Sequence, residues 1–272
     1  MTNTIRALLI ISTFIFCRYI MKEFWDENWT KTLLTLDKQS YVLLIPARYL
    51  FIYSPLLLMA TFLIKSVSMF EILGVSSGGF QQYLLAAILC CTPMAIGYAY
   101  LHTELNLSLA TLITGSIYAG FFEEIIFRAA FFGFLFRYCR WGFIPAASIS
   151  SIIFGLGHLY QGQDTMSALM AVGITSVAGA WFSWLYCECG YRIWFPLWMH
   201  IFMNAAYGIF GMTGGAAGDL EGNLCKATAI ILSLVYVNLL IRRGKNREIT
   251  LASLWKNQSE TRPKPVLSSQ AA

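Results

Sequence analysis

The stretch GFFEEIIFRAAFFGF, from Gly120 to Phe134, places Glu123, Glu124 and Arg128 inside an otherwise apolar run. A charged side chain at the centre of a bilayer helix is unfavourable by roughly 2.5 to 3.5 kcal/mol on insertion scales. If this segment spans a membrane, other polar groups of the protein must therefore compensate for these three.

The composition indicates that a bilayer is the right reference. Of the 272 residues, 57% are hydrophobic and 12% are charged, and the mean hydropathy is +0.61. A soluble domain carries about 25% charged residues. Because apolar runs recur from end to end, we expect one integral membrane domain rather than a soluble core with an anchor.

About eight stretches approach the ~20 apolar residues that a spanning helix needs. We therefore predict an all-α, polytopic bundle of transmembrane helices. The first stretch is the least secure, because Arg6 and Arg18 interrupt it, and nothing after it resembles a signal-peptide cleavage site. The predicted spans lie near 4–20, 43–64, 83–101, 108–135, 142–160, 166–187, 193–210 and 224–241.

The distribution of Lys and Arg predicts the orientation, since cytoplasmic loops are enriched in both. The segment 242–272 begins RRGKNR and is basic, whereas the loops 102–106, 160–164 and 211–223 contain neither residue. We expect a membrane domain at 1–241, with a motif-bearing core at about 108–210, and a disordered cytoplasmic tail at 242–272. The basic tail is typical of a topology signal that attracts anionic lipid, and we expect no nucleic-acid binding. The expected location is the bacterial cytoplasmic (inner) membrane.

Other polar side chains also fall at membrane depth. His158 ends the apolar stretch SIIFGLGH, and His200 lies within WFPLWMHIFMN. Asn204 follows His200 by four positions, so the two share a helix face. If these groups converge with the glutamates inside the bundle, they can satisfy one another's hydrogen bonds and leave the lipid-facing surface apolar.

Helical spacing predicts different roles for the two glutamates. Glu124 and Arg128 are four positions apart with the acid first, the favourable order for a structural salt bridge. Glu123 points about 100° away and has no basic residue three or four positions from it. A carboxyl group that is buried without a cation beside it binds a proton more readily than an exposed one. This behaviour suits a general acid or base.

These groups suggest acyl transfer to water without a covalent enzyme intermediate. Glu123 and one histidine could hold and deprotonate a water molecule, while Asn204 and the other histidine could bind the developing oxyanion. The small residues Gly115, Ser116, Ala119 and Gly120 precede Glu123 and would admit either a substrate or another helix. The Phe-rich run 131–136 is typical of lipid contact, and Trp181, Trp184, Trp194 and Trp198 are typical of interfacial anchors.

Three motifs carry a resemblance to a known family. EEIIFR at 123–128, FGLGH at 154–158 and HIFMN at 200–204 resemble, in order and spacing, those of the CAAX protease and bacteriocin-processing (CPBP, or Abi) family. That family includes the type II CAAX prenyl endopeptidases. The resemblance covers about Gly115 to Ala206, and it departs from the family pattern at Ala129, where members often have Gly.

The resemblance implies an intramembrane endopeptidase that cleaves a membrane-associated protein or peptide, possibly in its C-terminal segment. It implies that Glu123 and His158 activate water and that His200 and Asn204 form the oxyanion site. Whether a lipidated substrate is used stays open. The alternative is a non-enzymatic membrane factor, of bacteriocin-immunity or transporter-like type, that reuses the fold.

Metal dependence is a separate question. We expect no cofactor and a glutamate mechanism, because the chain has no HExxH helix. The alternative is a metalloprotease with zinc at Glu123, His158 and His200, since two imidazoles and a carboxylate can form a catalytic zinc site. Serine and aspartyl mechanisms fit less well, because Ser176 in GITSVAG sits mid-segment without a GxSxG turn and because Asp164 and Asp219 lie in loops.

Overall fold

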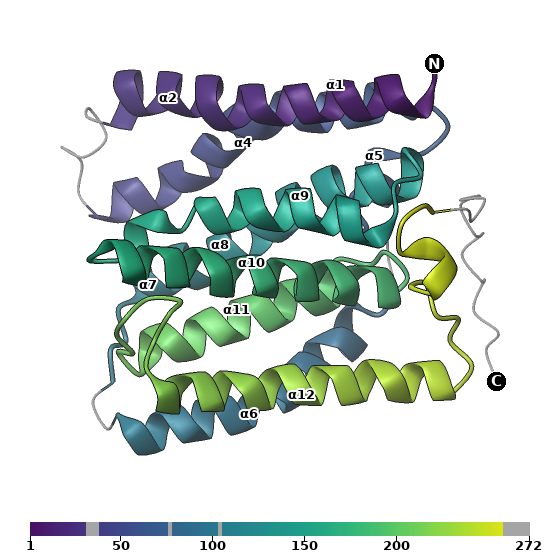
Figure 1. Ribbon diagram of the computed structural model, residues 1–272. Helices are drawn as coiled ribbons and strands as arrows, with labels where there is room; N and C mark the ends of the chain where they lie inside the picture. The colour runs from purple at the N-terminus through teal and green to yellow at the C-terminus, as the bar shows by residue number, and fades with distance from the viewer. Residues whose placement is uncertain (31–37, 76–77, 103–104, 258–272) are drawn as a thin grey trace.

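The computed structural model describes residues 1–30, 38–75, 78–102 and 105–257, and these are almost entirely helical, with no strand. Figure 1 shows the long helices running side by side, with the first residues and the segment after α12 at the same end of the bundle. The predicted all-α membrane bundle is confirmed.

The helices follow one another with short connections. The first helix runs through α1 (Asn3–Ile15), η1 (Phe16–Met21), α2 (Lys22–Trp25) and η2 (Asp26–Thr30). It is followed by α4 (Lys38–Leu63), α5 (Met69–Ile72) and α6 (Phe80–Leu101). The central helix joins α7 (Leu109–Leu112), η3 (Ile113–Tyr118), α8 (Ala119–Glu123) and η4 (Glu124–Tyr138). The remaining elements are α9 (Phe143–Leu156), η5 (Leu159–Gln161), α10 (Thr165–Glu188), α11 (Trp194–Ile209), α12 (Leu220–Arg242) and η6 (Leu251–Ser253).

Six of these helices are long and apolar enough to cross a membrane, so the chain fits an integral multi-pass membrane protein. All eight predicted segments are helical. Two predicted segments are not among the six candidate spans. The central helix carries Glu123, Glu124, Arg128 and Arg137, and α11 has only 16 residues. At 1.5 Å per residue, a helix of that length falls short of the ~30 Å hydrocarbon core.

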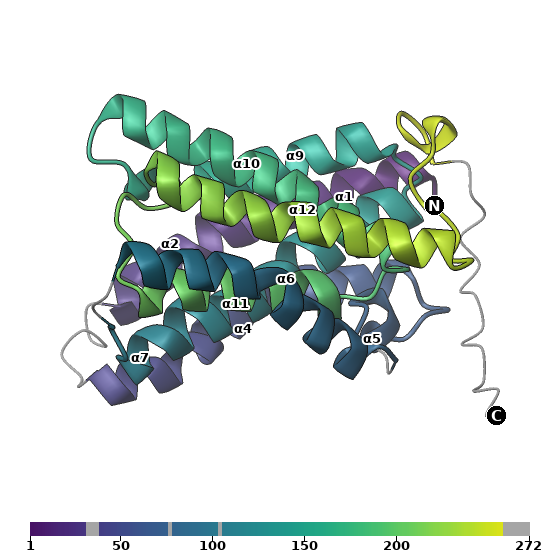
Figure 2. The same cartoon turned by 90° about the horizontal axis from the view of Figure 1, so that it is seen from below.

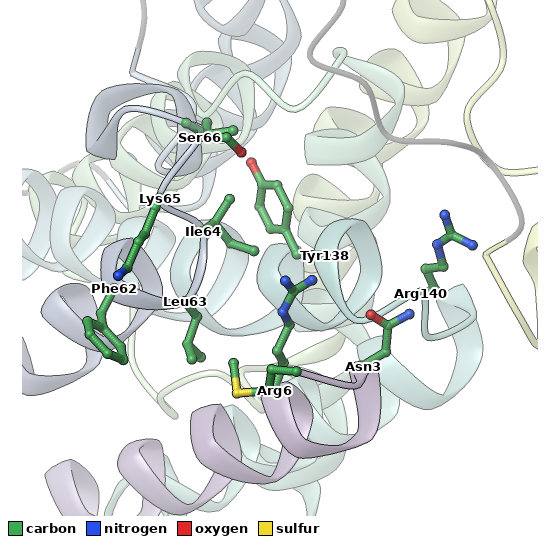
Figure 3. A pocket seen from close by; sticks show the side chains of 11 residues that line it. Asn3, Arg6, Phe62, Leu63, Ile64, Lys65, Ser66, Tyr138 and Arg140 are labelled. Atoms are coloured by element: carbon green, nitrogen blue, oxygen red, sulfur yellow. The ribbon is translucent and has the colours of Figure 1, made fainter.

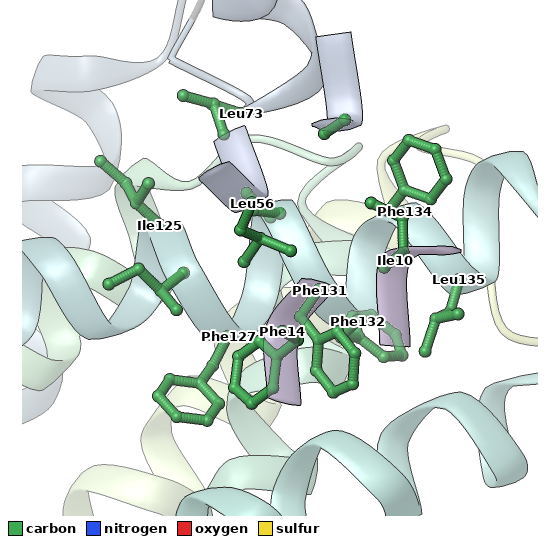
Figure 4. Packing of buried hydrophobic residues seen from close by; sticks show 14 of the residues in the cluster. Ile10, Phe14, Leu56, Leu73, Ile125, Phe127, Phe131, Phe132, Phe134 and Leu135 are labelled. Carbon is green, nitrogen blue, oxygen red and sulfur yellow. The ribbon is translucent and has the colours of Figure 1, made fainter. Parts of the chain in front are cut away.

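The second half of the central helix, η4, is enclosed by the other helices. Every residue from Glu124 to Arg137 is buried, and the ring of Phe131 stacks on that of Phe14 in α1 with centroids 4.1 Å apart. Figure 4 shows this cluster of phenylalanines together with Ile10 and Leu56 from the neighbouring helices. The expectation that residues 131–136 contact lipid was therefore wrong, because protein surrounds η4 on all sides at these positions.

A second hydrophobic core joins α6, α10, α11 and α12, and Figure 2 shows α6 beside α11 and α12. All four tryptophans pack against this core, and Trp194 and Trp198 make edge contacts with Phe80, with centroids 4.9 and 5.3 Å apart. The indole Nε1 of Trp181 donates a hydrogen bond to Ser233 Oγ. These residues therefore tie helices together.

The segment after α12 returns to the bundle. The backbone N–H groups of Glu248 and Ile249 donate to the Glu188 carboxylate at 3.2 and 3.0 Å. The side chain of Asn257 donates to the Phe136 carbonyl at 2.9 Å. Residues 243–257, which the sequence assigned to the tail, thus pack against the membrane domain, and 258–272 lie outside the described residues. The boundary at residue 241 stays a prediction.

Candidate functional site

The centre of the bundle holds a buried carboxylate between two basic groups. Glu124, at the start of η4, accepts a hydrogen bond from His200 Nδ1 of α11 at 2.8 Å through its Oε1 atom. Its Oε2 atom lies 3.2 Å from Arg128 Nε. The side chains of Glu124, Arg128 and His200 are 0%, 1% and 9% exposed. One carboxylate therefore compensates for the arginine and orients the histidine.

Aromatic rings complete the surroundings of Arg128. Its guanidinium carbon lies 4.2 Å from the centroid of Phe154 and 5.3 Å from that of Phe182. Neither Nη atom has a hydrogen-bond partner within the described part of the chain. Cation–π attraction, which strengthens in desolvated sites, is thus the main compensation for those two groups. Phe182 also stacks on the His200 ring with centroids 5.1 Å apart, so it fixes both residues.

Glu123 lies on the more open side of the same cluster. Its Oε2 atom is 3.9 Å from His200 Nε2, and its side chain is 21% exposed. This separation exceeds a direct hydrogen bond. Two acceptors this far apart can, however, both bind one water molecule, which then donates a hydrogen to each.

The structure thus joins Glu123, Glu124, Arg128 and His200, but it distributes their contacts differently from the sequence expectation. The Glu124–Arg128 pair is present as expected. Glu124 is also the direct partner of His200, the role expected for Glu123. The reason is that α11 crosses near the boundary between α8 and η4, where it can reach both carboxylates. Helical spacing within one segment cannot show which residue a second helix approaches.

His158 lies beside this cluster without a hydrogen bond to it among the described residues. Its Nδ1 atom is 2.8 Å from the Phe154 carbonyl oxygen. Because a carbonyl only accepts, Nδ1 carries the hydrogen and Nε2 of the neutral ring is a free acceptor. The ring centroid is 4.6 Å from that of Phe154, the same phenylalanine that covers Arg128. His158 is therefore a neighbour of the cluster through one shared aromatic residue.

Asn204 connects two helices. Its side-chain amide donates to the Gly115 carbonyl of η3 at 3.0 Å, which occupies one of its two N–H groups. Nearby, a Cβ atom added at Gly120 would lie 2.6 Å from Ile201 Cγ1 and 3.1 Å from Ile201 N. Of the two roles left open for the small residues, Gly120 thus serves the close approach of α8 and α11.

The fit of the proposed zinc ligands can be tested on the side chains. Across residues 1–30, 38–75, 78–102 and 105–257, no three or more His, Cys, Asp or Glu side chains form a group that could hold a metal ion. His158 Nδ1 donates to a backbone carbonyl and His200 Nδ1 to Glu124, so each ring keeps its Nε2 atom. Because Glu123, His158 and His200 are not gathered into one group, the described side chains do not fit the alternative zinc site, and we derive no step through a metal.

Sequence reasoning missed three contributors: Phe154, Phe182 and the Gly115 carbonyl. Phe154 is the first residue of the FGLGH stretch, so its motif was visible but its contact with Arg128 was not. Phe182 lies in α10, outside every motif, and only tertiary packing brings it to His200. A backbone carbonyl leaves no signal in a sequence at all.

The fold and this site define a multi-pass membrane protein with a buried Glu–His–Arg cluster at its centre. Residues 105–206, which contain all three motifs, match the family model described as "Type II CAAX prenyl endopeptidase Rce1-like". This motif-bearing segment is therefore similar to the type II CAAX prenyl endopeptidases, and the rest of the chain lies outside the match.

A curated relative agrees with the family match. The "Putative membrane peptidase YdiL" of Bacillus subtilis is 38% identical over 95 residues. That alignment covers 34% of this chain and 34% of the relative, so the likeness spans about a third of each protein. No solved structure matches the chain.

Proposed function

We propose that the protein is an intramembrane endopeptidase that hydrolyses a peptide bond of a membrane-associated protein or peptide. The observation that carries this proposal is the relation of His200 to the two adjacent glutamates: 2.8 Å from Glu124 and 3.9 Å from Glu123. The name of the Bacillus subtilis relative and the description of the family model point to the same class of reaction.

The proposed nucleophile is a water molecule between Glu123 and His200. Because Nδ1 of His200 donates to Glu124, Nε2 of the neutral ring is an acceptor. A water that donates one hydrogen to Glu123 and the other to Nε2 keeps a lone pair free for attack on a carbonyl. Either acceptor can take the proton as general base, and Glu124 stabilises the imidazolium if His200 does so.

His158 and Asn204 are proposed to stabilise the oxyanion or to transfer a proton to the leaving amine. Asn204 keeps one N–H after its bond to Gly115. His158 keeps its Nε2 atom, which in the protonated ring becomes a donor. The sequence resemblance instead paired His158 with Glu123 in activating water. We favour His200 as the partner, because it is the imidazole within 3.9 Å of Glu123.

The mechanism is of the glutamate type and uses no cofactor in this proposal. The partners are the lipid bilayer and a peptide substrate, and the basic C-terminal segment faces the cytoplasm of a bacterial inner membrane. We also propose that residues 1–241 form the membrane domain and that the residues after 241 form a cytoplasmic tail.

Substrate trapping tests the function. A Glu123→Gln variant with a photocrosslinking amino acid at Tyr118 is expressed in its own membranes, and captured peptides are identified by mass spectrometry. The proposal expects one captured protein segment that accumulates uncleaved and that the wild-type protein shortens. Glu221→Gln, an exposed acid at the start of α12, is the matched control and should process that segment normally. Capture without cleavage by the wild-type protein would favour a non-enzymatic membrane factor.

A further inference from the structure

A cavity of about 640 Å³ opens at one end of the bundle. The start of α1, the end of α4 with the loop after it, and the end of η4 line it, and none of the Glu–His–Arg cluster takes part. Figure 3 shows these side chains from close by. The volume falls within the range of about 300 to 1,000 Å³ that is usual for ligand sites.

The cavity is basic. Arg6, Lys65 and Arg140 line it, and its lining includes no Asp or Glu. None of the three forms an ion pair with an acidic side chain in the part of the chain that the structure describes. Three cations from separate elements gathered around one concave space attract an anion.

Two residues that line the cavity each carry a buried polar atom without a hydrogen-bond partner among the described residues. These atoms are Arg6 Nε and Tyr138 Oη. Figure 3 shows the Arg6 side chain directed toward Tyr138, whose hydroxyl points toward Ser66. Buried donors are nearly always satisfied in folded proteins. Acceptor oxygens of a ligand would satisfy the two atoms once these side chains turn toward it, because neither atom reaches the surface of the cavity now.

One wall of the cavity is apolar. Phe62, Leu63, Ile64 and Val67 form it, and Phe62 is 64% exposed. The Lys65 ammonium lies 5.3 Å from the Phe62 ring centroid. Since Phe62 and Leu63 end the candidate span Val42–Leu63, this wall lies where a membrane helix meets the headgroup region. An amphiphile would meet cations and apolar side chains at adjacent positions here.

We propose that this cavity binds a phosphate-bearing ligand, and that the phosphate belongs to the headgroup of an anionic phospholipid. Arg6 and Tyr138 donate to the phosphate oxygens, and arginine suits this role because its planar fork matches phosphate geometry. Lys65 and Arg140 neutralise the charge at the rim, and an acyl chain follows the exposed face of Phe62. The site is separate from the proposed peptidase centre.

The experiment counts bound lipid on the full-length protein. The protein is purified in a non-ionic detergent with equal amounts of phosphatidylglycerol and phosphatidylcholine, and retained lipids are counted by native mass spectrometry. We expect selective retention of phosphatidylglycerol. The triple variant Arg6→Gln, Lys65→Gln and Arg140→Gln should bind it at least tenfold more weakly, since each basic residue near a lipid headgroup contributes about fivefold.

A matched variant controls for loss of charge alone. Arg242→Gln, Arg243→Gln and Arg247→Gln remove three exposed cations at the end of α12 and just after it. This variant should lose much less phosphatidylglycerol than the cavity variant, because these cations attract anionic lipid at the surface without enclosing a headgroup. If the cavity variant does not fold, as judged by its melting temperature, Ser66→Trp fills the cavity from its exposed rim and keeps all charges. It should also lose the lipid.

Inorganic phosphate distinguishes the two sources of the anion. If phosphate binds the wild-type protein but not the cavity variant, while phosphatidylglycerol shows no selectivity, the phosphate site holds and its lipid source is refuted. Equal lipid loss from the cavity and control variants, or no preference for either anion, would overturn the proposal.

Discussion

Glu124 Oε1 accepts a hydrogen bond from His200 Nδ1 at 2.8 Å, although the two residues are 76 positions apart in sequence. The other oxygen of the same carboxylate lies 3.2 Å from Arg128. The buried Glu124 side chain thus contacts Arg128 within η4 and also links η4 to α11 through His200. Stability and the proposed chemistry are therefore coupled at Glu124, whereas at Glu123 they are separable.

Replacing Glu123 by Gln keeps the volume of the side chain but removes the proposed base. Turnover of the trapped peptide should fall by the ~10²- to 10⁴-fold that general acid–base catalysis contributes. The melting temperature should hold or rise, because Glu123 makes no ion pair with Arg or Lys among the described residues. Specific activity per folded molecule is the measurement, with Glu221→Gln as the control. Near-normal turnover would end the peptidase interpretation in favour of a non-enzymatic membrane factor.

Replacing Glu124 by Gln should reduce both the thermal stability of the protein and its turnover. The amide oxygen can still accept from His200, but the variant leaves the Arg128 charge buried without a counter-ion, which typically costs ~3 to 5 kcal/mol. Turnover per folded molecule should also fall, because a neutral amide stabilises the imidazolium less than a carboxylate does. Thermal melting in detergent and turnover are measured together. A folded, fully active variant would show that Glu124 is dispensable to both.

A double-mutant cycle isolates the Glu124–Arg128 pair. Arg128→Met should destabilise the protein by ~3 to 5 kcal/mol, since it leaves a buried carboxylate without its cation. Glu124→Gln combined with Arg128→Met should be more stable than either single variant, because no buried charge remains. Additive losses of melting temperature in the double variant would show that the two residues do not interact energetically.

Removal of metal tests the glutamate mechanism. The purified protein should contain no stoichiometric zinc, and dialysis against a strong chelator should leave turnover unchanged. Elemental analysis of wild-type and His158→Ala proteins is the measurement, and His102→Ala, in a loop after α6, is the control. Stoichiometric zinc that is lost only in the His158 variant would replace the glutamate mechanism with a metalloprotease one.

Gly120 sets how closely α8 and α11 pack. Gly120→Ala should destabilise the protein by ~1 to 3 kcal/mol, the usual cost of overpacking, because its Cβ atom would lie 2.6 Å from Ile201 Cγ1. Gly173→Ala in α10 is the matched control: no atom lies within 4 Å of its added Cβ, so it should be neutral or stabilising. Ile201→Ala should partly rescue Gly120→Ala. Equal melting temperatures for the two glycine variants would contradict this packing role.

Several features of the protein could be derived from the sequence because they depend on local or bulk properties. Apolar segment length predicted the membrane helices, since a helix must satisfy its backbone hydrogen bonds within lipid. The spacing of Glu124 and Arg128 predicted their pair, because residues four apart on one helix are neighbours whatever surrounds them. The motifs EEIIFR, FGLGH and HIFMN predicted a resemblance to the CAAX proteases, and residues 105–206, which contain them, match the family model of that kind.

Contacts between residues of different helices were decided only by the tertiary structure. It placed His200 against Glu124 as well as Glu123, and it covered Arg128 with Phe154 and Phe182. It also buried the phenylalanines of 131–136, because a hydrophobic side chain suits lipid and a protein core equally well and its sequence cannot distinguish the two. Contacts between helices depend on crossing geometry and on small residues such as Gly120, and these interactions act only after the separate segments have packed together.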